Sequence, residues 1–311
     1  MLGERRMPMR IRVKCLFIAK IILLTCAITG LGLTAARAAK IKAVATTSII
    51  GDVVKNVADN AVDLVVLVGP NGDAHEYEPV PADSVNMAKA DIIFENSLGL
   101  EHWLDKLYFA GGSKAKRIVV SHGVFLRIFE NNPRETDPHA WQDVTNVILY
   151  AQNIRDALDA IDPAHKNLYD ANAQNYIQKL QGLDAWVKRQ VALIPADKRK
   201  LVTNHDALGY FARRYGFQII GAVIPSATTE AADPSAKETV DLLNIIKSNR
   251  VHAIFSENMA NPKLAQTLAK EAGVVVGPDL YTDALGPAGS DGETYEKMIK
   301  YNVGVFQKYL K

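Results

Sequence analysis

The chain has 311 residues, with 36 Lys/Arg against 34 Asp/Glu and a formal net charge of +2. Residues 1–38 contain seven of those basic residues and one of the acidic ones, so the rest of the chain carries a net charge of −4. No basic patch indicates binding to nucleic acid, and the chain beyond residue 38 is long enough for two domains of ordinary size.

The N-terminus has the pattern of a secretory signal peptide. Basic residues between Arg5 and Lys14 precede an apolar stretch from Leu16 to Leu33, and Ala36-Arg37-Ala38 then has the small residues of a cleavage site. A membrane anchor is the alternative, but the apolar stretch is marginal in length for crossing a bilayer. We therefore predict a cleaved signal peptide at residues 1–38 and a protein exported to the periplasm.

Both cysteines, Cys15 and Cys26, lie within this predicted signal. The rest of the chain therefore has no cysteine for metal ligation, disulfide formation or nucleophilic catalysis. Leu23-Leu24-Thr25-Cys26 resembles the sequence at which lipoproteins are lipidated, but Thr25 is a poor residue before the cysteine. A lipid anchor is the less favoured alternative.

Strand-like and helical patterns alternate through both halves of the remaining chain. In the first half, helical patterns at 48–58 and 82–90 lie among apolar runs at 41–46, 62–68, 91–95 and 117–120. In the second half, helical patterns at 208–215, 236–249 and 262–272 lie among apolar runs at 200–203, 218–224, 253–256 and 274–277. Such alternation favours parallel sheets, so we predict an α/β fold with two β/α lobes.

A longer helical pattern, Pro163 to Leu193, separates the two halves. Its apolar residues recur mostly at three- and four-residue steps, and they are Leu168, Tyr176, Leu180, Leu183, Val187 and Val191. A single helix of about 30 residues would be on the order of 45 Å long, which suits a rigid connection between lobes. A surface helix within one domain is the alternative. We predict an N-terminal lobe at 39–162, a linking helix at 163–195 and a C-terminal lobe at 196–311.

Three histidines and one aspartate are the candidate functional residues. His75, His139, His205 and Asp283 come from segments far apart in the chain, and each follows an apolar, strand-like run. Open α/β sheets bind ligands at the carboxyl ends of their strands, and imidazole with carboxylate suits a borderline metal such as zinc. Taken singly, each residue could be an ordinary loop or turn residue. As a set from distant segments, they indicate a site where two lobes meet.

Three segments around these residues resemble known motifs, and they are Asp73-Ala74-His75-Glu76-Tyr77-Glu78-Pro79, Asp137-Pro138-His139-Ala140-Trp141 and Thr282-Asp283-Ala284-Leu285-Gly286. They are similar to motifs of the cluster A-I metal receptors, the solute-binding proteins of zinc and manganese ABC importers. The resemblance covers nearly all of the chain after the predicted signal. It implies that His75, His139, His205 and Asp283 bind a metal ion in a cleft between the lobes. It also implies a partner, an ABC permease in the inner membrane, and we expect a monomer.

The third ligand position discriminates among these receptors. Manganese and iron receptors similar to this chain often have Glu there, whereas zinc receptors and some mixed receptors have His, as this chain does at His205. Three imidazoles and one carboxylate also suit Zn²⁺ better than Mn²⁺. Zinc receptors often have a long His-rich loop after the first ligand. In this chain, the only histidines between Glu76 and Asp137 are His102 and His122. We predict a Zn²⁺ receptor, with a Mn²⁺ or mixed receptor as the alternative.

Enzymatic functions have less support. A hydrolytic zinc site needs an open coordination position, which four protein ligands would close. The sequence also has no His-Glu-x-x-His, Gly-x-Ser-x-Gly or Walker pattern. We predict no enzymatic activity, and a zinc-dependent hydrolase or a surface adhesin remains a remote alternative.

Two acidic residues are candidates for supporting roles. Glu257 ends a predicted strand in the second half and could orient a ligand imidazole. Asp206 could do the same, or it could cap the following helix. We expect no ligand role for the other four histidines, which are His102, His122, His165 and His252.

Overall fold

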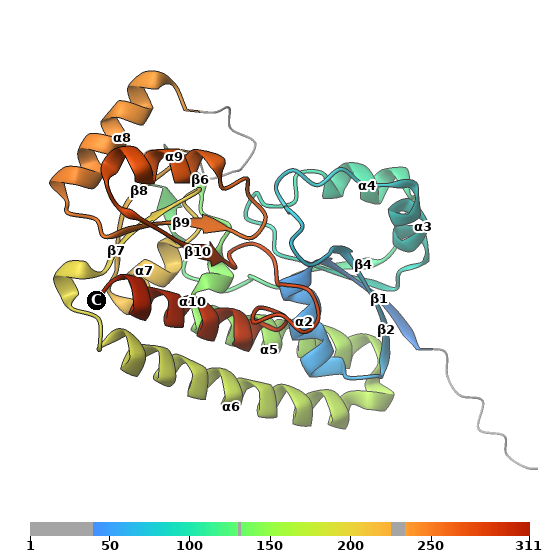
Figure 1. The fold of residues 1–311 in the computed structure, drawn as a ribbon. Coiled ribbons are helices and arrows are strands. Elements are labelled where there is room, and N and C mark those ends of the chain that lie inside the picture. The colour runs from blue at the N-terminus through green and yellow to red at the C-terminus, as the bar shows by residue number, and fades with distance from the viewer. Residues whose placement is uncertain (1–39, 130–131, 225–233) are drawn as a thin grey trace, which may run out of the picture. The chain divides into compact units, whose positions relative to one another are not determined.

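A computed structural model describes residues 40–129, 132–224 and 234–311, and strands alternate with helices through them (Figure 1). The predicted signal peptide lies outside these residues. Among the helices that the structure describes, none has the length and the apolar character that crossing a bilayer requires.

The described residues before α6 form a four-stranded parallel sheet in the order β2-β1-β3-β4. β1 lies in its interior, where Ala43 pairs with Leu64 on one side and with Ile92 on the other. Interior parallel strands are buried on both faces, which explains the continuous apolar runs. The elements of this half are β1 (Ile41–Thr47), α2 (Ser48–Ala58), β2 (Val62–Val68), α3 (Pro81–Lys89), β3 (Ile92–Glu95), α4 (Leu104–Ala110), β4 (Lys116–Val119), β5 (Ile128–Phe129), β6 (Asn132–Thr136), η1 (Ala140–Gln142), α5 (Val144–Ile161) and η2 (Pro163–His165).

The described residues after α6 contain two parallel strand pairs, β7-β8 and β10-β9, and β7 lies against β9. α8 and α9 pack on these strands and on each other. The elements of this half are η3 (Ala196–Lys198), β7 (Lys200–Thr203), α7 (Gly209–Tyr215), β8 (Gln218–Ala222), α8 (Ala236–Ser248), β9 (Ala253–Glu257), α9 (Lys263–Ala272), β10 (Val275–Leu280) and α10 (Tyr295–Tyr309).

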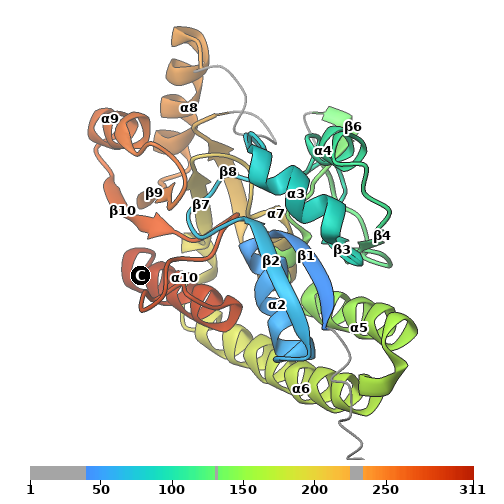
Figure 2. The same cartoon turned by 90° about the vertical axis from the view of Figure 1, so that its right-hand side faces the viewer.

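The long helix α6 (Lys166–Val191) contacts both halves, as Figures 1 and 2 show. It packs on α2 and α5 of the first half and on α7 and α10 of the second. It has 26 residues and is shorter than the predicted helix, because Pro163–His165 forms a separate 3₁₀ turn. The pattern was also wrong at Leu168, which is 38% exposed, whereas its neighbour Tyr169 is buried.

The predicted α/β class with parallel sheets and two lobes is confirmed. Each predicted strand and helix is present, with ends that shift by a few residues. The sequence patterns did not predict the antiparallel hairpin β5-β6, the short helix α4, the C-terminal helix α10 or most of α5, for which only the start near Asp143 was expected. These elements matter for the site, because α5 follows the His139 segment and α10 packs on β10.

Candidate metal centre

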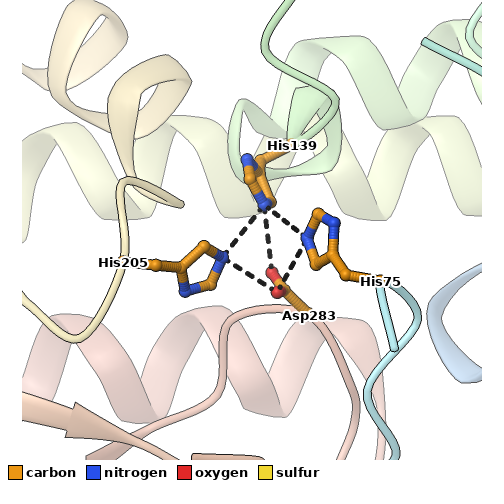
Figure 3. Close-up of side chains that lie close together, drawn as sticks. All are labelled: His75, His139, His205 and Asp283. Atoms are coloured by element: carbon orange, nitrogen blue, oxygen red, sulfur yellow. Dashed lines mark hydrogen bonds and ion pairs between the residues drawn. The ribbon is translucent and has the colours of Figure 1, made fainter. Parts of the chain in front are cut away.

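The four candidate side chains meet at one point (Figure 3). One ligand atom from each of His75, His139, His205 and Asp283 lies within 4.8 Å of the others, and all four residues are buried. Nε2 of His139 lies 3.2 Å from Nε2 of His75 and 3.1 Å from Nε2 of His205. The sequence prediction that these distant residues come together therefore agrees with the structure.

His75 is presented by the loop that follows β2. A turn at Gly69–Gly72 leads to Asp73, whose Oδ1 accepts a hydrogen bond from the backbone N–H of His75 at 2.8 Å. This local contact is the usual way in which an aspartate stabilises a turn two residues ahead. The carbonyl of Ala74 accepts a hydrogen bond from Nε1 of Trp103 at 2.9 Å. The loop is thus held from both sides, and the imidazole projects into the cluster.

His139 lies just before the turn η1, and Asp137 determines its orientation. Oδ1 of Asp137 accepts a hydrogen bond from the backbone N–H of His139 at 3.0 Å and lies 2.7 Å from its Nδ1. Asp137 is itself fully buried and pairs with Arg127 through its other oxygen at 2.7 Å. The two contacts to one carboxylate fix the imidazole, and its Nε2 points at the other ligands.

His205 comes two residues after β7, and Glu257 at the end of β9 holds it. Oε1 of Glu257 accepts a hydrogen bond from the backbone N–H of His205 at 2.9 Å, and Oε2 lies 2.7 Å from Nδ1. Thr282 donates to Oε2 at 2.9 Å. Glu257 thus has the supporting position that the sequence indicated, whereas Asp206 faces away from the imidazole and pairs with Arg127.

Asp283 follows β10 and faces all three imidazoles. Its Oδ2 lies 3.1 Å from Nε2 of His205 and 3.4 Å from Nε2 of His75, and its Oδ1 lies 3.6 Å from Nε2 of His139. Residues of the first half hold the preceding residue, Thr282, in place. Its carbonyl accepts hydrogen bonds from the side chains of Trp141 and Gln142. Both carboxylate oxygens are therefore directed at the point that the imidazoles surround.

The carboxylates behind two of the imidazoles determine where the protons lie. A negative carboxylate favours a proton on the ring nitrogen that it faces, so Asp137 and Glu257, each 2.7 Å from an Nδ1 atom, favour neutral rings of His139 and His205 with the proton on Nδ1. Each Nε2 then has a lone pair, and the two Nε2 atoms are 3.1 Å apart. Two lone pairs cannot hydrogen-bond to each other. The arrangement therefore suits a positive charge between these atoms, a proton when no metal ion is bound, and carboxylate-backed imidazoles are typical of metal sites.

The same groups shift each other's pKa values. Burial lowers the pKa of His205, but the carboxylates of Glu257 and Asp283 outweigh burial and raise it well above its ordinary value. Burial raises the pKa of Asp283, but His205 and His139 outweigh it and lower the pKa well below the usual range. Burial also lowers the pKa of His75. Without a metal ion, the centre thus favours a proton on His205 beside an ionised Asp283.

The other four histidines lie apart from the site, and two residues that support it were not predicted from the sequence. His102, His122, His165 and His252 are exposed and lie outside the cluster. Sequence reasoning missed Asp137 and Arg127 as supporting residues. A signal for Asp137 was available, because an aspartate two residues before a histidine can contact both its backbone and its ring. Arg127 had no such signal, since its contacts lie 10 and 79 residues away.

A family model described as ZnuA, zinc-uptake complex component A periplasmic, matches residues 43–309. Two curated relatives are named for manganese. The manganese-binding lipoprotein MntA of Halalkalibacterium halodurans is 37% identical over 266 residues, covering 86% of this chain and 87% of that protein. The manganese ABC transporter substrate-binding lipoprotein PsaA of Streptococcus mitis is 34% identical over 302 residues, covering 93% of this chain and 94% of that protein.

Solved structures of metal-binding proteins are also similar to this chain, and one of them is named for zinc. The periplasmic zinc binding protein TroA from Treponema pallidum superposes with a TM-score of 0.82 and 31% sequence identity. The match covers 88% of this chain and 99% of the TroA chain. The similarity thus extends over nearly the whole length of both proteins.

Proposed function

Because the chain belongs to the family of metal-binding substrate-binding proteins of ABC transporters, we propose that it captures Mn²⁺ outside the cytoplasm and passes it to its transporter, with Zn²⁺ as a second cargo. The chain is a receptor and not an enzyme. We further propose that His75, His139, His205 and Asp283 are the metal ligands. Imidazole nitrogens and a carboxylate are donors that both ions accept.

The donor set is the observation that carries this proposal. Three Nε2 atoms and both oxygens of Asp283 face one point, so the carboxylate can bind an ion through one oxygen or through two. One oxygen gives four donors, which suits Zn²⁺. Two oxygens give five donors with more oxygen character, which suits Mn²⁺ better. The buried carboxylates behind the imidazoles support either ion by keeping the rings in the binding tautomer.

The sequence favoured Zn²⁺ because of His205, but Mn²⁺ now has more support. Two relatives at 37% and 34% identity are named for manganese. The segment between Glu76 and Asp137 also lacks a His-rich loop. Zn²⁺ binds nitrogen and oxygen donors more tightly than Mn²⁺ does, whatever the biological cargo. Where both ions are present, the identity of the bound ion would therefore depend on the supply of each metal as well as on its affinity.

Elemental analysis of the protein purified without added metal tests the cargo. We expect manganese, or manganese with zinc, at a total near one ion per chain. The matched variant is His205→Glu, which replaces a nitrogen donor by an oxygen donor. It should shift the ratio of Mn²⁺ to Zn²⁺ affinity toward Mn²⁺ by about tenfold or more in a competition titration, as expected for a harder donor.

Zinc as the sole metal in cells that have ample manganese would contradict the Mn²⁺ proposal and leave a Zn²⁺ receptor. An unchanged affinity ratio in His205→Glu would show that His205 does not bind the ion. A protein that binds neither ion would contradict the receptor proposal as a whole.

Export follows from the proposed role, and the form of export is the second part of the proposal. We predicted a freely soluble periplasmic protein after cleavage at residue 38. Relatives that are named lipoproteins favour a lipid anchor instead, and Cys26 is the cysteine placed to carry it. Cys26 and the predicted cleavage site after Ala38 lie outside the part of the chain that the structure describes. Mass spectrometry of the exported protein decides between a lipidated Cys26 and an N-terminus at Ala39.

A further inference from the structure

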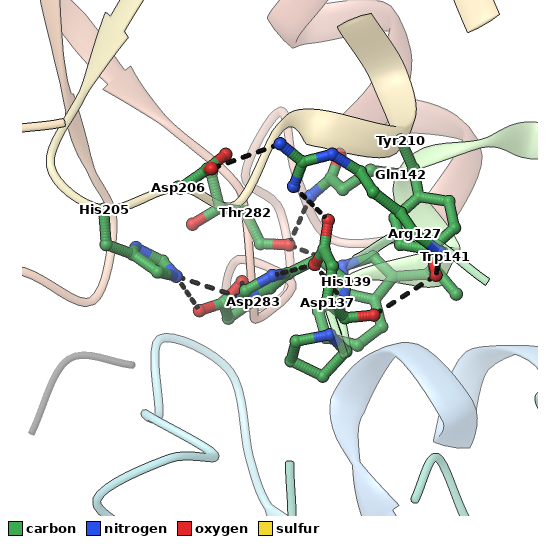
Figure 4. A network of polar contacts seen from close by, with 12 residues as sticks. Arg127, Asp137, His139, Trp141, Gln142, His205, Asp206, Tyr210, Thr282 and Asp283 are labelled. Carbon is green, nitrogen blue, oxygen red and sulfur yellow. Dashed lines mark hydrogen bonds and ion pairs between the residues drawn. The ribbon is translucent and has the colours of Figure 1, made fainter. Parts of the chain in front are cut away.

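Arg127 contacts both halves of the molecule beside the candidate metal centre (Figure 4). It lies in the first half, on the segment between β4 and β5. Its Nη1 donates to Oδ2 of Asp137 at 2.7 Å, and its Nη2 donates to Oδ2 of Asp206 at 3.2 Å. Asp137 is the carboxylate that orients His139, and Asp206 is the residue directly after His205. One guanidinium thus joins the two chain segments that present two proposed ligands.

Further contacts hold Arg127 in this position. Its backbone N–H donates to the Tyr210 hydroxyl at 3.0 Å, and that hydroxyl in turn donates to the carbonyl of Asp137 at 3.2 Å. Its guanidinium also lies over the Phe129 ring, 5.2 Å from the centroid. Its side chain is only 17% exposed. A guanidinium that pairs with two carboxylates in a partly buried position holds them in a defined geometry.

Gly209 at the start of α7 leaves the space that the guanidinium occupies. A Cβ atom on this residue would lie 2.1 Å from Cζ and from Nη1 of Arg127, and those are among its nearest neighbours. The backbone of Gly209 is not in the left-handed region, so the glycine is explained by the close approach of Arg127. Alanine is also a better helix former than glycine. Gly209→Ala should therefore displace the guanidinium while it leaves every charge in place.

We propose that Arg127 is a positioning residue that controls how fast the metal ion leaves. It acts through Asp137 on His139 and through Asp206 on the His205 segment, and it keeps the ligands of the two halves together. The inference rests on the proposed function, because it needs His139 and His205 to be ligands. Without Arg127, the two segments separate more readily, and an ion held between them is released sooner.

The sign of the effect distinguishes positioning from simple charge. Arg127 is a cation near a cation site, so its charge alone repels the ion, and its removal would strengthen binding. Loss of positioning has the opposite effect. A faster release in Arg127→Gln therefore cannot arise from the lost charge. Gly209→Ala separates the two effects again, since it moves the guanidinium and keeps its charge.

Arg117 provides a matched control. It also pairs with two carboxylates, Glu95 and Asp105, and lies over an aromatic ring, that of Tyr108. Arg117 lies on β4, and all of these partners belong to the first half, on β3 and α4. Arg117→Gln thus removes a comparable set of contacts from the fold without separating ligand segments.

The experiment loads each purified protein with Mn²⁺ alone and, separately, with Zn²⁺ alone, and follows release into excess chelator by stopped flow. Arg127→Gln and Gly209→Ala should each raise the dissociation rate at least tenfold, with association rates within about threefold of the parent. The double variant should release no faster than Arg127→Gln alone. Arg127→Lys, which keeps one donor group, should lie between parent and Arg127→Gln. Arg117→Gln should stay within twofold of the parent.

A dissociation rate that is unchanged or reduced in Arg127→Gln would overturn the inference, and so would a parent-like rate in Gly209→Ala. An equal increase in Arg117→Gln would also overturn it, because general loss of stability would then explain the effect. These outcomes leave the proposed function intact as long as the parent protein binds the ion. Failure of the parent to bind either ion would overturn both.

Discussion

At the scale of single residues, His205 determines how acid acts on metal binding. Its imidazole is fully buried between the carboxylates of Glu257 and Asp283. These carboxylates outweigh burial and raise the pKa of His205 well above its ordinary value. In the metal-free protein at neutral pH, Nε2 therefore carries a proton in the direction of Asp283. A metal ion must replace this proton.

The first prediction concerns the proton that the metal displaces. Because the pKa of His205 is raised, the ring is protonated below that raised pKa, and the apparent affinity should increase with pH throughout this range. The slope should be about tenfold per pH unit, which corresponds to one proton released per ion. His75 adds no proton at neutral pH, since burial lowers its pKa.

Isothermal titration calorimetry in buffers with different ionisation enthalpies counts the released protons. We expect a number close to one near pH 7. Replacement of the imidazole by Gln at His205 should bring the count close to zero, although the affinity also falls. A count of zero in the parent protein would mean that His205 is already neutral before the ion binds, in conflict with the electrostatics of the site.

The local sequence around individual residues predicted where some of the site residues lie. His205 and Glu257 each follow or end an apolar strand, so their location at the carboxyl edge of a sheet followed from the pattern. The convergence of segments so far apart in the chain was indicated by the four residues as a set, and the resemblance of the motifs to known receptors then specified it. Arg127 was not predicted, because its role depends on long-range pairing that leaves no local pattern.

At the scale of elements, Asp143 connects the site to the helix behind it. Asp143 is the N-cap of α5, and its Oδ1 accepts hydrogen bonds from the backbone N–H and the hydroxyl of Thr145 at 2.9 Å and 2.7 Å. α5 begins shortly after His139 and packs along α6. The cap therefore defines where the rigid helix pair starts and where the ligand loop ends.

The second prediction is the cost of removing this cap. Asp143→Ala leaves the backbone N–H of Thr145 without its acceptor and should lower the free energy of unfolding by about 1 kcal/mol. Asp156→Ala is the control, because Asp156 is on the same helix, is 64% exposed and pairs with Arg155, whose side chain is 30% exposed. It should change the stability by less than about 0.5 kcal/mol. Urea unfolding of the metal-free proteins measures both, and equal effects would show that the cap is not the cause.

Helices and strands differed in how far the sequence predicted them. Parallel strands were found because they contain continuous apolar runs, and those in the interior of the sheet, β1 and β3, are largely buried. α5 and α10 do show buried residues at three- and four-residue steps, for example Tyr150, Ile154 and Leu158 in α5, so this spacing could have identified them. The hairpin β5-β6 could not be found in this way. Its second strand, Asn132–Thr136, is polar and contains a proline, a composition that is typical of loops.

At the scale of the whole molecule, several contacts besides the ligands join the two halves near the centre. The backbone N–H of Asn71 donates to the carbonyl of Leu285, and that of Leu285 donates to the hydroxyl of Ser48. α6 runs beneath both halves and restricts how far they can separate. A metal ion that binds ligands from both halves adds to these contacts. Binding should therefore stabilise the fold as one unit.

The third prediction is the size of this stabilisation. With free metal at a hundredfold excess over the dissociation constant, binding adds about 2.7 kcal/mol to the free energy of unfolding and raises the melting temperature. Asp283→Ala should keep the fold but reduce the metal-induced shift, because it removes the one carboxylate ligand. Asp279→Ala is the control, since Asp279 is exposed on the preceding strand, and it should show the full shift. A full shift in Asp283→Ala would exclude Asp283 as a ligand.

The central claim is that one ion binds to the four side chains, and equilibrium dialysis with elemental analysis tests it most directly. The metal-free protein is dialysed against Mn²⁺ or Zn²⁺, together with His139→Ala and the control His122→Ala, whose exposed histidine lies outside the cluster. We predict one ion per chain for the parent and for His122→Ala, and at least a hundredfold weaker binding for His139→Ala. Parent-like binding by His139→Ala, or a parent that binds no ion, would contradict the account.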